Sequence, residues 1–197
     1  RLITGRGTYV RNQVVPGAQH CVFVRSDSPF ARFALKSGHI APQVLLFTGA
    51  DCPHAQLPVP NPIVPLRAQL DMPVLPERVT RYVGQPLALV ITQSLVEANA
   101  AAQAIAVTYE ALPPEAIDPI YRVDYAWGNR EIPAAQNAAF SAHISQKQAR
   151  VVAAAMEPRA TIAQWNEGEQ SLTMWLQCQA VTRARDDVAA LLQIDKH

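Results

Sequence analysis

Two side chains that can bind metal, Cys52 and His54, stand two positions apart in a proline-rich part of the chain. Thiolate and imidazole are both zinc ligands, but protein zinc sites use three or four protein ligands. No further Cys or His lies close to this pair in the sequence. We therefore interpret Cys52 and His54 as loop residues and predict no metal site in this chain.

An acid and a base flank a proline in the sequence Met156-Glu157-Pro158-Arg159. Glu157 and Arg159 could form an acid–cation pair in a site. They could instead make structural hydrogen bonds in a turn whose backbone is fixed by Pro158. We favour the structural interpretation, and no residue of the chain is predicted to be catalytic.

Gly5 and Gly7 enclose Arg6 near the start of the chain, and Gly-x-Gly is part of a dinucleotide-binding pattern. That pattern also needs a third glycine and a following helix, and both are missing here. The opening residues therefore favour a turn that leads into a short strand.

The composition fits a soluble globular protein: 197 residues, of which 49% are hydrophobic and 17% charged, with a net charge of +1. This charge gives no attraction to nucleic acid or anionic membranes, and no apolar run is long enough to span a bilayer. Three widely spaced cysteines without a Cys-x-x-Cys motif argue against disulfides and against an iron–sulfur cluster in this chain. We expect a cytoplasmic location, with a periplasmic one as the alternative.

The stretch of residues 78–118 has the strongest signals for regular structure. The apolar run 87–91 lacks Gly and Pro and predicts a strand covered on both faces. Ser94 and Glu97 have the spacing of a capping box and begin an Ala-rich helix that extends to about residue 106. The apolar face of this helix is predicted to be Leu95, Ala98, Ala102 and Ile105. Residues 107–109 predict the next strand, so the unit suggests a crossover with a parallel strand pair.

Further strands are predicted at residues 20–26, 44–51, 144–152, 161–165 and 171–179, and a long loop at residues 58–76. The strands 161–165 and 171–179 flank a turn and form a hairpin. Along the second of them, alternation places Gln179 at the strand end, on the face opposite to the apolar residues Leu172, Met174, Leu176 and Cys178. A helix is predicted over 182–192, with an apolar side made of Val188, Leu191 and Leu192.

Residues 118–134 read as a connection that contains Tyr121, Tyr125 and Trp127 among charged residues. Such aromatic residues could form a stacking platform for bases. Because no basic groove accompanies them, we favour packing against a neighbouring domain or subunit. We place the domain boundary here, which gives a first domain of residues 1–120 and a second of residues 121–197.

Several motifs together resemble one enzyme family. RYVGQPLALVI, an Ala-rich helix and VTYEALPPEAID resemble the core of the α/β hammerhead domain. That domain opens the molybdenum-binding subunit of the xanthine dehydrogenase, aldehyde oxidase and carbon monoxide dehydrogenase family. The Thr-Gly-x-Asp sequence at 48–51, Met-Glu-Pro-Arg at 156–159, Leu-Thr-x-Trp at 172–175 and a Gln at the strand end recur in the same order. The resemblance implies an α+β fold: a hammerhead domain followed by the beginning of a mixed α/β molybdopterin-binding domain.

The chain departs from the family pattern at three places. The loop 26–30 is about two residues longer, and the connection after Asp118 is shortened. Ala180-Val181-Thr182 stand where the family often has Gly-Pro-His.

The resemblance also implies a function. Enzymes of this family hydroxylate a carbon next to nitrogen or oxygen, or oxidise carbon monoxide, with molybdenum held by a pterin. Electrons pass to 2Fe–2S clusters and FAD on partner subunits or domains. Gln179 matches the glutamine that the family aims at a molybdenum oxo ligand, and its alternative role is a strand-end residue that faces solvent.

The family's glycine-rich loop, pterin anchors and terminal glutamate base would all lie beyond His197. We therefore expect a fragment of a molybdenum hydroxylase large subunit that is inactive and binds no cofactor by itself. The alternative is a stand-alone, non-catalytic binding or assembly module with the same fold.

Overall fold

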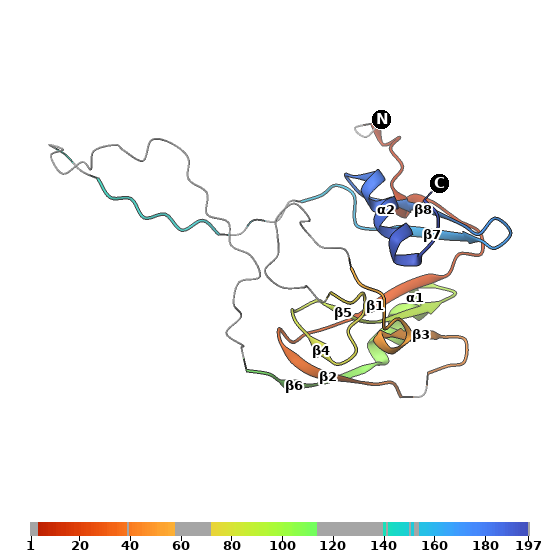
Figure 1. Cartoon of the computed structure of the whole chain (residues 1–197), viewed down its shortest axis with the longest axis horizontal. Coiled ribbons are helices and arrows are strands. Elements are labelled where there is room, and N and C mark those ends of the chain that lie inside the picture. Colours follow the sequence, from red (N-terminus) through yellow and green to blue (C-terminus); the bar gives the residue numbers. More distant parts are fainter. Residues whose placement is uncertain are drawn as a thin grey trace. The chain divides into compact units, whose positions relative to one another are not determined.

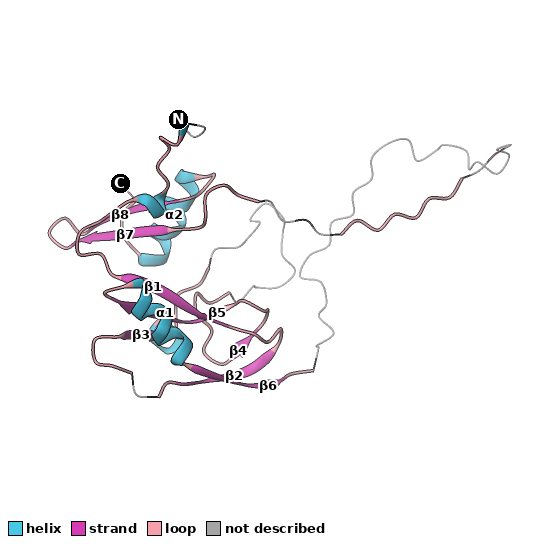
Figure 2. Ribbon diagram, turned by 180° about the vertical axis from the view of Figure 1, so that it is seen from behind, coloured by secondary structure: helices cyan, strands magenta, loops and turns pink. Residues whose placement is uncertain are grey.

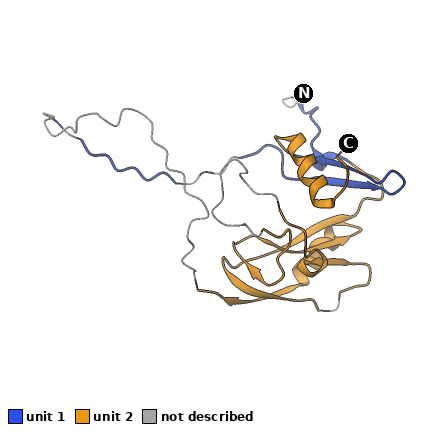
Figure 3. Cartoon of the chain, viewed as in Figure 1, with its two compact units in different colours: residues 1–13, 122–177 blue, residues 14–121, 178–197 orange. Residues whose placement is uncertain are grey.

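The computed structural model describes residues 4–38, 40–57, 72–113, 140, 142–149, 151 and 154–196. Two compact units are present (Figure 3): Arg1–Gln13 with Arg122–Gln177, and Val14–Tyr121 with Cys178–His197. Figure 1 labels their helices and strands, and Figure 2 shows the chain from behind. The second unit holds two three-stranded sheets, and the first holds a two-stranded hairpin.

The first sheet has the strand order β1-β5-β3, with β1 at His20–Arg25, β5 at Pro86–Thr92 and β3 at Leu45–Thr48. Both pairings are antiparallel and set Phe23, Leu89 and Phe47 opposite one another. The inward residues Ala88 and Val90 are fully buried, whereas Phe23 and Phe47 on the other face are 42% and 41% exposed. The predicted strands 20–26 and 87–91 are confirmed. The strand predicted as buried at 44–51 is shorter, and its side chains Leu45 and Phe47 are exposed.

Two features fix the ends of these strands. Gly84, with a φ of 85° that favours glycine, bends the chain before β5 and donates its N–H to the Ser26 carbonyl at 2.7 Å. Residues Gly49–Asp51 end β3 in a 3-10 helix, η3. Both bends lie where the strand ladders stop.

The second sheet has the order β4-β2-β6, with β4 at Val79–Thr80, β2 at Ala31–Lys36 and β6 at Ala106–Ala111. Both of its pairings are antiparallel. The predicted parallel pair around the helix is therefore wrong. Strands β5 and β6 lie in different sheets because each of them pairs with strands from earlier in the chain.

Helix α1, at Leu95–Ala104, packs on β1 and β5. The Ser94 hydroxyl caps it by accepting the Glu97 N–H at 3.2 Å. Ala98 is fully buried and Ile105 nearly so, and both match the predicted apolar face. Leu95 does not match it, because its side chain in the first turn is 48% exposed. The core beneath the helix joins both sheets and consists of Val24, Ala88, Val90 and Ile105 with Leu35, Leu46 and Val107 around them.

The hairpin pairs β7, at Thr161–Asn166, with β8, at Ser171–Leu176, in antiparallel register. The Asn166 side-chain oxygen accepts the N–H groups of Gly168 and Glu169 in the turn. This confirms the predicted hairpin, but β8 ends three residues before Gln179. The predicted strand 144–152 is wrong for residues 144–149, which have no regular structure, and Ile144 is 84% exposed.

The prediction for the first residues, a turn that leads into a short strand, is partly wrong. Residues 4–9 form no strand, and Val10–Asn12 form a 3-10 helix, η2, which contacts β7. Gly5 has a φ of 68°, in the region that favours glycine, and makes a turn. A turn is thus present as predicted, but it leads into a helical segment.

Helix α2, at Val181–Leu192, follows Gln179 directly. Ala189 is its buried residue, while Leu191 and Leu192, which were predicted on the apolar side, are 37% and 49% exposed.

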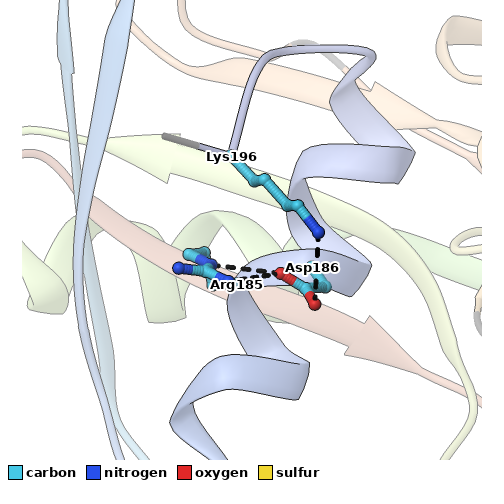
Figure 4. A network of polar contacts seen from close by, with 3 residues as sticks. All are labelled: Arg185, Asp186 and Lys196. Carbon is cyan, nitrogen blue, oxygen red and sulfur yellow. Dashed lines mark hydrogen bonds and ion pairs between the residues drawn. The ribbon is translucent and has the colours of Figure 1, made fainter.

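Figure 4 shows how the chain after the helix turns back. The Asp186 carboxylate lies 2.9 Å from Arg185 and 3.9 Å from Lys196. Exposed ion pairs of this kind contribute little to stability.

Candidate functional site

Gln179 lies in the short connection between the end of β8 at Leu176 and the start of α2 at Val181. Its side chain is exposed. Ala180 is the N-cap residue of α2 and provides no side-chain cap, in contrast to Ser94 of α1. The structure thus places Gln179 on a bend before a helix, where its neutral amide is accessible.

Gln177, which precedes this connection, is anchored by its side chain. Its Nε2 donates a hydrogen bond to the main-chain carbonyl of Glu157 at 3.0 Å. The Glu157 side chain in turn accepts the N–H of Val10 at 3.0 Å between Oε1 and N. Three segments meet through these two bonds: helix η2, the turn before β7 and the end of β8.

These contacts decide between the two interpretations of Glu157. Its half-buried carboxylate bonds a backbone N–H, which supports the structural role. Arg159 is exposed. The Met-Glu-Pro-Arg sequence therefore forms a structural turn at Glu157.

The Thr-Gly-x-Asp sequence also has a structural explanation. The Asp51 Oδ2 accepts the Thr48 N–H at 2.7 Å and the Thr48 hydroxyl at 2.9 Å. These two hydrogen bonds lower the pKa of the Asp51 carboxyl. A Cβ on Gly49 would lie 2.7 Å from the main-chain carbon and oxygen of Pro76, so only glycine fits there.

Cys52 and His54 lie just after this turn. The Cys52 thiol donates to the Thr48 carbonyl at 3.5 Å, and His54 is exposed. Among the residues that the structure describes, no three or more His, Cys, Asp and Glu side chains gather in a way that could hold a metal ion.

His54 also borders an open cavity of about 260 Å³. The cavity is lined by His54, Gln56, Asp187, Ala190, Leu191 and Gln193. Asp187 is paired with Arg183 at 3.5 Å.

All three cysteines are free. Partial burial raises the pKa of the Cys21 thiol, which lowers its reactivity. Tyr121, Tyr125 and Trp127 lie outside the described residues. Within the described part of the chain, no helix is long and apolar enough to cross a membrane.

The two-sheet fold and the segment around Gln179 correspond to known domains. The sequence model described as "Aldehyde oxidase and xanthine dehydrogenase, a/b hammerhead domain" matches residues 4–113, and the "Molybdopterin cofactor-binding domain" matches residues 114–197. The chain belongs to the aldehyde oxidase and xanthine dehydrogenase family.

Two relatives share 28% sequence identity with the chain. One is the nicotine 6-hydroxylase large subunit of Paenarthrobacter nicotinovorans, matched over 91% of this chain and 24% of its own length. The other is the quinoline 2-oxidoreductase of Pseudomonas putida 86, whose structure matches 100% of this chain and 28% of its own, with a TM-score of 0.79. The aldehyde oxidoreductase of Desulfovibrio gigas shares the fold at 17% identity and a TM-score of 0.69, over 98% of this chain and 24% of its own. The chain thus spans about a quarter of the length of these proteins.

Sequence reasoning singled out Gln179 and Glu157 but missed the role of Gln177. Alternation along the predicted strand 171–179 places Gln177 on the same face as Gln179, but β8 ends at Leu176, before both residues. The partners of the Glu157 side chain and of Gln177 lie 147 and 20 residues away, so spacing alone could not reveal them. The resemblance of Met-Glu-Pro-Arg to a family motif drew attention to Glu157 but indicated neither of these partners.

Proposed function

We propose that the chain is the N-terminal part of the molybdenum-binding large subunit of a hydroxylase, with domains at residues 1–120 and 121–197. The observation that carries the proposal is the order of the two domain matches, which together cover residues 4–197. The FAD and 2Fe–2S groups that accept electrons would lie on partner subunits or domains. The reading frame that encodes the chain tests this: a frame that stops at His197 supports the alternative of a stand-alone binding or assembly module.

The substrate class we propose is a nitrogen heterocycle, hydroxylated at a ring carbon next to nitrogen. The two relatives at 28% identity are named for nicotine and quinoline, and both compounds contain such a ring. In a complete enzyme, turnover of quinoline-type substrates should exceed turnover of aliphatic aldehydes. Faster oxidation of aldehydes would contradict this assignment.

Gln179 is the residue of this chain that we propose to contact the molybdenum cofactor. Its exposed amide fits such a group, because an N–H can donate to an oxo ligand without adding a charge. The cofactor, when bound, supplies the redox chemistry. The contribution of the chain is to hold one donor in a fixed place.

The test is Gln179→Ala in the complete subunit. Turnover should fall by roughly 10- to 100-fold, the range for loss of an outer contact at a metal site, with folding and molybdenum content unchanged. Gln164→Ala is the matched control, since Gln164 is an exposed glutamine of β7. Equal turnover of Gln179→Ala and wild type at full molybdenum occupancy would remove this role.

A further inference from the structure

We infer that Gln177 and Glu157 are positioning residues that fix the chain segment carrying Gln179. The role of Gln179 itself rests on the function proposed above. The hydrogen bonds that support the inference are independent of that function.

Gln177 lies just beyond the end of the strand ladder. The last ladder pair of the hairpin is Thr161 with Leu176, so Gln177 is the first residue beyond it. A strand end without ladder hydrogen bonds frays unless another contact replaces them. The bond from Gln177 Nε2 to the Glu157 carbonyl, at 3.0 Å, is such a contact.

Glu157, whose carbonyl accepts the Gln177 hydrogen bond, is itself held by a second hydrogen bond. Glu157 is half-buried, and its carboxylate accepts the Val10 N–H at 3.0 Å. Hydrogen bonds to a charged acceptor are stronger than neutral ones. Val10 begins helix η2, which is closed by the bonds from Asn12 N to the Tyr9 carbonyl and from Gln13 N to the Val10 carbonyl. Gln177 is therefore tied through Glu157 to a second folded segment.

Gln179 is close to Gln177 along the chain. Only Cys178 separates Gln177 from Gln179, so the two Cα atoms can be no more than about 7.6 Å apart. An anchored Gln177 thus restricts where the Gln179 side chain can reach. Ala180 adds no side-chain cap on the other side, so the described contacts leave Gln177 as the side chain that fixes this bend.

Neither Gln177 nor Glu157 needs to touch a cofactor or substrate in this arrangement. Their effect is on order in residues 178–180. The measurement must therefore report local order and separate it from global stability.

The experiment uses the 197-residue chain and backbone ¹⁵N relaxation at Cys178, Gln179 and Ala180. In Gln177→Ala, order at these three amides should fall, while amide protection in β5 stays as in the wild type. Gln177→Glu keeps the side-chain size but loses the N–H donor, so it should loosen the same amides. Gln164→Ala should leave them unchanged. Unchanged order at Gln179 in both Gln177 variants would overturn the inference.

The Glu157 variants test the second bond. Glu157→Ala should speed hydrogen exchange of the Val10 amide by roughly tenfold and loosen Gln179 as well. Glu157→Gln retains an oxygen acceptor. It should therefore keep most of the Val10 amide protection and most of the order at Gln179. Loss of Val10 protection without any change at Gln179 would show that Glu157 serves η2 alone, and would overturn its positioning role.

Turnover of the complete subunit separates this inference from the proposed function. If both hold, Gln177→Ala lowers kcat with KM nearly unchanged, and Gln179→Ala lowers it further. If the relaxation results appear but Gln179→Ala turns over like wild type, the proposed role of Gln179 fails while the positioning of the segment stands. If Gln179→Ala is slow but the Gln177 variants leave order and kcat unchanged, the positioning inference fails alone.

Discussion

Two turns of this molecule each contain a carboxylate that accepts hydrogen bonds from the backbone. The donors lie at very different separations along the sequence. Asp51 accepts two hydrogen bonds from Thr48, three residues earlier, and closes the turn after β3 on itself. Glu157 accepts one from Val10, 147 residues earlier, and its carbonyl accepts one from Gln177, 20 residues later. Both turns carry motifs that the family resemblance rests on. The comparison shows that one such motif shapes a local bend, whereas the other joins distant segments.

The largest effect we expect comes from Gly49→Val, in the turn that Asp51 closes by local hydrogen bonds. The new side chain would start 2.7 Å from the Pro76 backbone, and neither main chain can easily move. Overpacking of this kind costs about 1–3 kcal/mol or more of folding free energy. Urea unfolding followed by far-UV circular dichroism measures the loss.

The control for that variant is Gly168→Ala in the hairpin turn. There a Cβ would meet only the Asn166 side-chain oxygen, at 3.6 Å, which is ordinary contact. Its unfolding midpoint should stay close to that of the wild type. A Gly49→Val protein as stable as Gly168→Ala would show that the close approach to Pro76 relaxes without cost.

An intermediate effect is expected from removal of residues 1–13, which contain the distant partner of the Glu157 carboxylate. The deletion takes away the Val10 N–H that Glu157 accepts and the η2 contact with β7. A typical hydrogen bond contributes about 0.5–1.5 kcal/mol to stability, which is less than the cost expected for the clash at Gly49. Hydrogen exchange should speed up in β7 and β8 and stay unchanged in β5. Equal acceleration in β5 would mean that the N-terminal segment stabilises the sheets rather than the hairpin.

The smallest effect is expected from Asp51→Asn, because an amide oxygen can still accept the Thr48 N–H. Since the hydrogen bonds lower the Asp51 pKa below its usual 3.8, the charged carboxylate stabilises the fold at pH values above that. This contribution is lost as the pH falls through the lowered pKa. The Tm of wild type should thus exceed that of Asp51→Asn at neutral pH, and the gap should close in acid. A Tm difference that widens on acidification would contradict the stabilising role of the ionised Asp51 carboxylate.

The parts of the fold that sequence analysis predicted correctly depend on neighbouring residues. The apolar run of β5, the Ser94 cap of α1 and the turn between β7 and β8 are each set within a few positions. The parallel pair was wrong because strand partners are chosen over the whole sheet. Leu35 of β2 and Val107 of β6 pair with each other, 72 residues apart.

The candidate site was predictable only in part, because its contacts join residues that are far apart in the sequence. Gln179 could be placed near a strand end by alternation, but not the exact end of β8, because apolar residues alternate past Leu176 while the ladder stops. The Cys178 side chain, assigned to the apolar face, is exposed. Gln177 looked equivalent to any polar strand residue until its partner, the Glu157 carbonyl in the turn before β7, was known.

The bond between Val10 and Glu157 also bears on how the protein is made. Synthesis at about 5–20 residues per second separates the appearance of these two residues by roughly 7–30 seconds. All strands of the two sheets end by Ala111, so they can pair well before Glu157 is made. Residues 4–13 are therefore synthesised well before Glu157, which accepts the Val10 N–H. During that interval their backbone is open to chaperones and proteases, and slower translation between residues 112 and 157 would lengthen the exposure.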